Sequence, residues 1–130
     1  MIEQLPIAFQ VRGSTERRAV LAVLAQVRPR RGRYAAFSMH LIAGNTGLQT
    51  RLIQSIVKFL VEERHLPIGT GTSKPFGYFW IVSNDERRAV RDHFVRRALS
   101  NLEHARAYDT DSIVGPLVGQ IEINFPEVRR

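Results

Sequence analysis

The sequence predicts an α+β fold in which three helices precede a β-hairpin and one long helix follows it. Apolar residues recur at helical spacing over four segments of the chain. Between the third and fourth segments the pattern changes to an aromatic, β-branched run beside a turn-forming stretch, which is typical of a hairpin. The 130 residues suffice for one domain with a usable core, and the absence of cysteine excludes a disulfide framework.

Three amphipathic helices are expected in the first half of the chain. Each carries an apolar stripe at helical spacing. Ser14 and Ser38 are good capping residues, while Pro29 and Gly47 end the first two helices. The expected helices extend from Ser14 to Pro29, from Ser38 to Thr46 and from Thr50 to Glu63.

A β-hairpin and the longest helix are expected next. Residues 65–70 and 76–82 (FGYFWIV) form the two strands, and the Gly-Thr-Ser-Lys-Pro stretch between them has turn chemistry. Ser83 followed by Glu86 is a capping box that opens a helix continuing to about Tyr108.

The rest of the chain is less regular. Asp111 is expected to cap a short helix through residues 114–117, and residues 121–125 are expected to form a final strand. The predicted parts of the chain are an extended segment 1–13, a domain 14–108 whose long helix covers 84–108, and a C-terminal extension 109–130.

Residues 39–58 fit the spacing of a helix-turn-helix. Ala43 is the small residue where two helices cross, and Gly47, four residues later, lies where the turn needs a positive φ. Ile53 and Ile56 then face the interior. Two short helices joined by a glycine turn and followed by a hairpin are the layout of a winged helix-turn-helix. We therefore expect a three-helix core plus a β-hairpin wing, with a long additional C-terminal helix.

This register leaves one face of the third helix pointing away from the core. Its side chains are of the types that contact DNA: amides for adenine edges, arginine for guanine, lysine and hydroxyls for phosphates. An ordinary solvated helix face carries similar residues, so the assignment depends on the fold. The candidate residues of this recognition helix, about residues 50–63, are Gln49, Thr50, Arg51, Gln54, Ser55 and Lys58.

The charge distribution favours a polyanionic partner. The chain has 19 Lys and Arg against 12 Asp and Glu, a net charge of +7. Residues 1–65 hold 10 basic and 4 acidic side chains, whereas residues 66–130 hold 9 and 8. A one-sided basic domain is typical of nucleic-acid binding. Double-stranded DNA is the expected partner. RNA would suit the same charge, but no RNA-binding module is recognisable.

Two further segments are candidates for contact with the DNA backbone. Residues 28–34 (RPRRGRY) are expected to form a loop beside the helix-turn-helix, and each phosphate neutralised there adds about 0.9 to the salt slope of binding. The tip of the hairpin offers hydroxyls and a lysine for backbone positioning. The alternatives are a flexible solvated loop and an exposed turn. The residues concerned are Arg28, Arg30, Arg31, Arg33, Thr72, Ser73 and Lys74.

The segment GLQTRLIQSIVKFLVEERHLPIGTGTSKPFGYFWIVSNDE resembles a winged helix-turn-helix family common in small phage and mobile-element proteins. With the later element RRALSNLEHARAY, the resemblance covers about residues 38–108. It implies a winged-helix fold and DNA binding in a regulatory or replication-associated role. Gln49 departs from the Ser-like cap of that family, so the helix is expected to begin at Thr50. The matching positions are Gly47, Leu48, Arg51, Ile53, Val57, Leu60, Pro67, Ile68, Gly77, Tyr78 and Phe79.

No enzyme, metal site or small-molecule cofactor is expected. The four histidines lack the spacing of metal ligands, and GTGTSK lacks the spacing of a phosphate-binding loop. No apolar run approaches the roughly 20 residues that span a bilayer, so no membrane association is expected. Glu3 stands where a signal peptide would be positively charged. The expected location is therefore cytoplasmic.

Two questions stay open from the sequence. A winged helix can also serve as a protein–protein interaction module without DNA binding, and weak salt dependence of any DNA binding would indicate that function. The apolar stripe on residues 90–105 either closes the domain core or forms a homodimer seam through helix 84–108.

Overall fold

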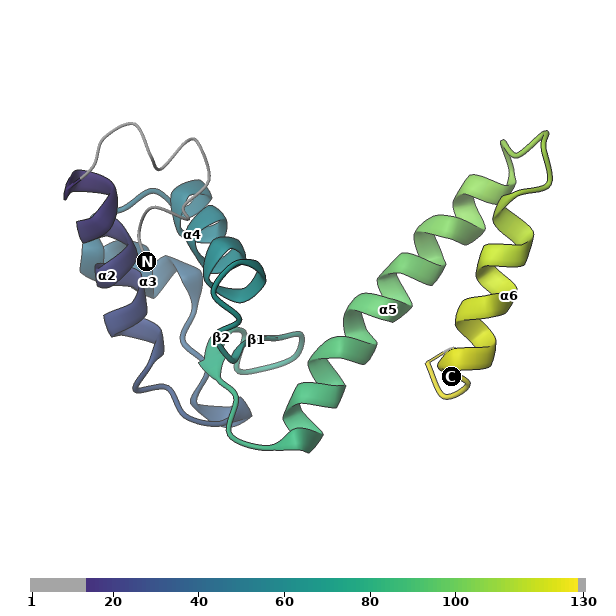
Figure 1. The fold of residues 1–130 in the computed structure, drawn as a ribbon. Helices are drawn as coiled ribbons and strands as arrows, with labels where there is room; N and C mark the ends of the chain where they lie inside the picture. Colours follow the sequence, from purple (N-terminus) through teal and green to yellow (C-terminus); the bar gives the residue numbers. More distant parts are fainter. Residues whose placement is uncertain (1–13, 129–130) are drawn as a thin grey trace. The chain divides into compact units, whose positions relative to one another are not determined.

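The computed structural model describes residues 14–128 and contains helices and a two-stranded antiparallel sheet in that range (Figure 1), which confirms the α+β class. The expected segment 1–13 lies outside the described residues. The chain groups into two compact units, residues 1–87 and 88–130. The elements are α2 (Ser14–Val27), η2 (Arg33–Ala35), α3 (Met39–Thr46), α4 (Thr50–Glu62), β1 (Ile68–Gly71), β2 (Gly77–Trp80), α5 (Asn84–Arg106) and α6 (Val114–Asn124).

The turn between α3 and α4 is built as the sequence predicts. The Ser38 hydroxyl accepts a hydrogen bond from the Leu41 N–H at 3.1 Å and so caps α3. Gly47 ends α3 in the left-handed conformation, with φ of 73°, and its N–H donates to the Ala43 carbonyl at 2.8 Å. Gln49 makes no capping bond through its side chain, and α4 begins at Thr50. The expected cap, the positive φ and the start of α4 are confirmed.

The core of the first unit is formed by α2, α3 and α4 together with the hairpin. Ile42 from α3 and Ile53 and Ile56 from α4 are completely inaccessible to solvent. Burial of each such side chain stabilises the fold by about 1.5–3 kcal/mol. Because the inner face of α4 is buried in this core, its opposite face points toward solvent. The buried residues of α4 are Ile53, Ile56, Val57, Phe59 and Leu60.

Gly44 gives a stability prediction. It lies within α3, its φ is not positive, and an added Cβ would meet no atom within 4 Å. Gly44→Ala is expected to stabilise the unit by up to about 1 kcal/mol, because glycine is entropically costly in a helix. The melting temperature measured by circular dichroism should rise, by about 4–8 °C at most. Gly47→Ala is the control and should lower it, since its φ of +73° strains an alanine.

The hairpin is confirmed, but its strands differ from the expected ranges. β1 pairs with β2 from Ile68↔Trp80 to Gly71↔Gly77. The expected first strand began at His65, which was wrong. His65 has a φ of 57°, and the Leu66 N–H donates to the Leu60 carbonyl at 3.0 Å. This stretch therefore closes α4 before the strand begins.

The arginine-rich segment before α3 contains the expected loop, but this loop is hydrogen-bonded to β2 and is not the flexible solvated loop that was the alternative. Its backbone lies along β2, where the Gly32 N–H donates to the Trp80 carbonyl and the Phe37 N–H donates to the Tyr78 carbonyl, both at 2.8 Å. The short helix η2 lies between these two contacts. The segment thus covers the edge of β2 that β1 leaves unpaired, and it is fixed in place by the sheet.

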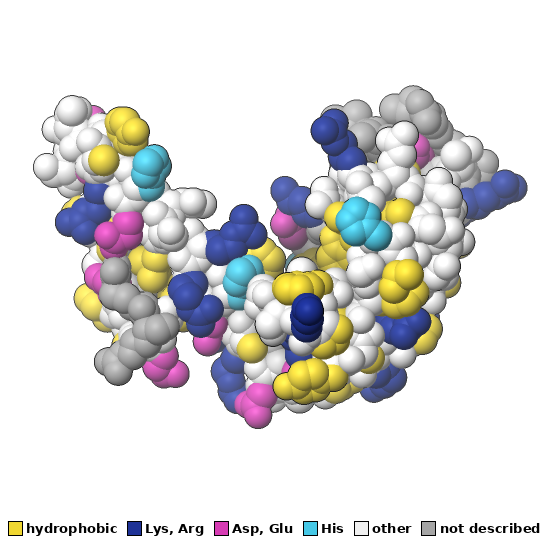
Figure 2. All heavy atoms as spheres, turned by 180° about the vertical axis from the view of Figure 1, so that it is seen from behind, with side chains coloured by type: hydrophobic (Ala, Val, Ile, Leu, Met, Phe, Trp, Pro, Cys, Tyr) yellow, Lys and Arg dark blue, Asp and Glu magenta, His cyan; other side chains and the backbone are white. Residues whose placement is uncertain are grey.

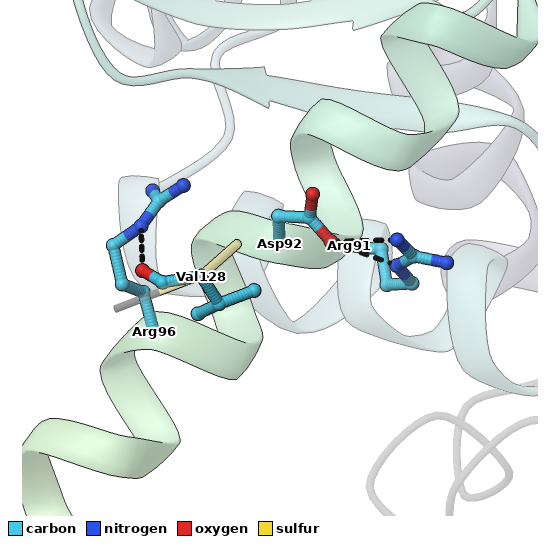
Figure 3. A network of polar contacts seen from close by, with 4 residues as sticks. All are labelled: Arg91, Asp92, Arg96 and Val128. Carbon is cyan, nitrogen blue, oxygen red and sulfur yellow. Dashed lines mark hydrogen bonds and ion pairs between the residues drawn. The ribbon is translucent and has the colours of Figure 1, made fainter. Parts of the chain in front are cut away.

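The second unit contains a helical hairpin in which α6 runs back along α5 (Figure 1). Leu99, Val118 and Val128 are its buried residues. Arg96 Nε donates to the Val128 carbonyl at 2.9 Å and holds the segment after α6 on α5, while Arg91 pairs with Asp92 at 2.8 Å (Figure 3). Part of the apolar stripe of α5 is therefore used inside this unit.

In the C-terminal segment the expected helix through residues 114–117 is confirmed, but the expected strand and the expected capping residue were wrong. Residues 121–125 do not form a strand, because α6 continues to Asn124 and carries Ile121 against α5. Pro116 falls in the first turn of α6, where a backbone N–H has no helical partner to lose. The cap also differs, since Asp109 and not Asp111 binds the start of α6: its carboxylate accepts from the Val114 N–H at 2.8 Å.

Asp109 gives a pH prediction. The hydrogen bond from the Val114 N–H is the main reason that the pKa of Asp109 lies below its ordinary value. A carboxylate with a lowered folded-state pKa stabilises the fold above the ordinary value of about 4, and this stabilisation is lost as the pH falls through the folded-state pKa. Thermal melts between about pH 2 and pH 7 should therefore show a smaller acid-induced decrease for Asp109→Asn than for the wild type. If the melting temperatures of the two proteins fell equally with decreasing pH, the stabilising role of the Asp109 carboxylate would be contradicted.

Candidate nucleic-acid interface

The outer face of α4 brings together most of the side chains predicted for the recognition helix. Arg51, Gln54, Ser55 and Lys58 are exposed and recur at spacings of three, four and seven residues, which places them on one helix face. Gln49 is exposed just before the helix, while Thr50 is half-buried. The Ser55 hydroxyl also donates to the Arg51 carbonyl of its own helix at 3.2 Å.

The charges on this face are arranged along the helix. Arg51 lies in the first turn of α4, and Lys58 lies about two turns later, a rise of about 10 Å. The first turn holds no acidic residue, and the acidic residues Glu62 and Glu63 stand at the opposite end. The positive end of the helix dipole therefore coincides with Arg51, which makes this end of α4 attractive to an anion.

The four arginines of the segment before α3 have different surroundings. The Arg28 guanidinium lies 5.5 Å from the centre of the Trp80 ring, and that of Arg30 lies 3.9 Å from the Phe37 ring. Both cations are thus stacked on aromatic side chains, that of Trp80 in β2 and that of Phe37 in the segment paired with β2. Arg31 is exposed and makes no side-chain hydrogen bond or ion pair within the described part of the chain.

Arg33 connects the hairpin loop to the rest of the first unit. Its guanidinium donates to the Pro75 carbonyl at 2.7 Å, to the Ser73 hydroxyl at 3.1 Å and to the Ser73 carbonyl. Its backbone N–H donates to the Glu86 carboxylate at 2.7 Å. Arg33 was predicted to contact phosphate, but most of its guanidinium hydrogen-bond donors are used within the hairpin loop, which carries the other predicted backbone contacts. Thr72, Ser73 and Lys74 are exposed on that loop.

Glu86 is the second half of this connection and was only partly anticipated. Its N–H donates to the Ser83 hydroxyl at 3.1 Å, which is the expected half of the capping box. Its carboxylate does not return to the Ser83 N–H. It accepts from the Val82 N–H at 3.0 Å and from Arg33. No local pattern could have shown this, because Arg33 is 53 residues away in the chain.

A metal site and a membrane-spanning helix each require a particular arrangement of residues. Among the described residues no three His, Asp or Glu side chains gather in a way that could hold a metal ion. None of the helices there has both the length and the apolar character needed to cross a bilayer. Figure 2 shows basic side chains spread among apolar ones over the face that it draws.

Comparison of the chain with known protein families, with curated proteins and with solved structures finds no match in any of the three.

Proposed function

We propose that the protein binds double-stranded DNA as a winged helix-turn-helix, with α4 entering the major groove. The observation that carries the proposal is the outer face of α4, where exposed Arg51, Gln54 and Lys58 stand on a helix whose inner face is locked into the core. An arginine and an amide on one rigid helix face can read guanine and adenine edges. Arg51 is assigned to a base edge, and Lys58 to a phosphate.

The hairpin and the arginine-rich segment form the rest of the proposed interface. In this assignment the hairpin is the wing, and its exposed residues Thr72 and Lys74 contact the backbone. Arg31 binds a phosphate, while Arg33 positions the wing through its bonds to Ser73 and Pro75. The resemblance to phage and mobile-element proteins supports a regulatory or replication-associated role.

Selection from a random duplex-DNA library at near-physiological salt tests the proposal. An enriched sequence motif in the retained DNA is the expected result. Retention without enrichment would reduce the proposal to non-specific binding through the basic residues. No retention at all would overturn it and favour the alternative of a protein–protein interaction module.

The different surroundings of Arg31 and Arg33 give a matched pair of variants. Arg31→Ala should lower the salt slope of DNA binding by about 0.9 without changing the free energy of unfolding by more than about 0.5 kcal/mol. Arg33→Ala should destabilise the unit by about 1–3 kcal/mol, because it removes a charged donor from two carbonyl groups. Urea unfolding and titrations at several salt concentrations measure both quantities. If the two variants changed the salt slope and the free energy of unfolding equally, the assignment of Arg31 to phosphate and of Arg33 to the wing would be contradicted.

A further inference from the structure

The outward face of α6 carries no charged side chain. Val118 points into the small core of the second unit, so the opposite side of the helix faces outward. Ile123 is 78% exposed, Ile113 just before the helix is 60% exposed and Leu117 is 46% exposed. Pro116, Gln120 and Asn124 complete this surface, which we call the α6 outer face. The only charged residue in α6 is Glu122, which is half-buried.

A helix with this composition is unusual on a surface. Helices that face water carry charged or polar residues on the outer side, and helices that are apolar all round are covered. α6 buries one side against α5, and its other side is aliphatic or neutral. Leu117 and Ile123 on this short helix, and Ile113 just before it, thus remain exposed, which is the pattern of an interaction surface.

The second unit is also too small to be well stabilised by its own core. In its described part it buries only Leu99, Val118 and Val128, with five partly buried side chains around them. Units of about 40 residues usually need disulfides, a metal or oligomerisation for stability. The sequence has no cysteine, and the described residues hold no group of metal ligands. Oligomerisation is a further means by which such small units are stabilised.

We propose that the α6 outer face binds the same face of a second copy of this chain. An uncharged aliphatic surface is complementary to itself, as a two-fold interface requires. The charge distribution agrees, because residues 88–130 hold seven basic and six acidic side chains, whereas residues 1–87 hold twelve and six. Two copies therefore meet with little repulsion through the second unit, and the basic first unit is left for other partners.

Residues that recur at helical spacing provide the contact. Ile113, Leu117, Gln120 and Asn124 follow one another at four-, three- and four-residue steps, and Pro116, Gln120 and Ile123 form the neighbouring row. Such rows interdigitate when two helices pack side by side. Because the face is short, we expect a modest interface below about 1,200 Å² and micromolar self-association.

Sedimentation of the 130-residue chain without DNA, from about 1 to 200 µM, tests the proposal independently of any DNA binding. The wild type is expected to form dimers with increasing concentration. Ile123→Glu and Leu117→Glu are each expected to raise the dimer dissociation constant at least about tenfold. In a two-fold dimer each substitution is present in both subunits, so every variant places two charges in the interface. Leu21→Glu is the matched control, because Leu21 is 55% exposed on α2 in the other unit and should leave dimerisation unchanged.

Circular dichroism of each variant separates loss of association from loss of folding. Ile123 is exposed, so its replacement removes no core contact and the helical signal should persist. The milder Gln120→Glu places a charge on the same face and should also weaken the dimer. A wild type that stays monomeric at all concentrations would overturn the proposal. Dimers that persist in both Ile123→Glu and Leu117→Glu would also overturn it. So would an equal loss of dimerisation in the control variant Leu21→Glu.

Discussion

Gly77→Ala is expected to unfold most of the first unit. Gly77 begins β2 with a φ of +122°, a conformation that side chains rarely adopt. An added Cβ would lie 2.1 Å from the Phe37 carbonyl oxygen and 2.7 Å from the Ser38 Cα. Both atoms belong to the backbone and cannot turn aside. The structure can relieve the overlap only by separating β2 from the segment that precedes α3.

That separation would break several interactions at once. The Tyr78 N–H donates to the Phe37 carbonyl at 3.0 Å, and the Phe37 N–H donates to the Tyr78 carbonyl at 2.8 Å. Phe79, which is 1% exposed, would lose part of its packing. The lost contacts and the backbone strain together should lower the free energy of unfolding by more than about 4 kcal/mol. This is a large share of the usual 5–15 kcal/mol.

Urea unfolding followed by tryptophan fluorescence measures the effect, because the single tryptophan, Trp80, lies in β2. Gly77→Ala should show little folded baseline, whereas Gly44→Ala should unfold at or above the wild-type midpoint. The same substitution is thus compared at a crowded and at an open glycine. A wild-type midpoint for Gly77→Ala would mean that β2 does not approach Phe37 as closely as the structure shows.

The sequence predicted the first unit well where local signals decide the structure. The Ser38 cap, the left-handed Gly47 and the apolar spacing of α4 each depend on residues within a few positions of one another. The C-terminal segment was predicted poorly for the opposite reason. Its glycines and its proline disfavour a long helix and its alternating apolar residues favour a strand locally, but contacts with α5 select a helix.

The candidate interface divides in the same way. The outer face of α4 could be predicted, because burial of Ile53 and Ile56 fixes which side chains of the same helix point outward. The placement of the arginines could not be predicted, because their contacts are distant in sequence. Arg33 meets residues 40 and 42 positions later, and Arg28 meets Trp80. An arginine-rich run reveals charge, but only the fold shows which guanidinium groups are already bound.

Arg51→Ala is expected to weaken binding to a selected DNA site by about 1–3 kcal/mol, a factor of about 5–150. Its side chain is exposed in the first turn of α4, so removing it costs no core packing. The free energy of unfolding should therefore stay within about 0.5 kcal/mol of the wild type. Arg97→Ala, which removes an exposed arginine from the second unit, controls for the loss of one positive charge.

Arg51→Lys separates base reading from simple attraction to phosphate. A lysine keeps the charge but loses the planar fork that binds guanine through two hydrogen bonds. If Arg51 reads a guanine, the lysine variant should lose affinity for the selected site while its affinity for unrelated duplex DNA stays near that of the wild type. If lysine restores binding to both kinds of DNA, Arg51 serves the backbone. In that case Gln49 and Gln54 become the side chains of this face that can select a base.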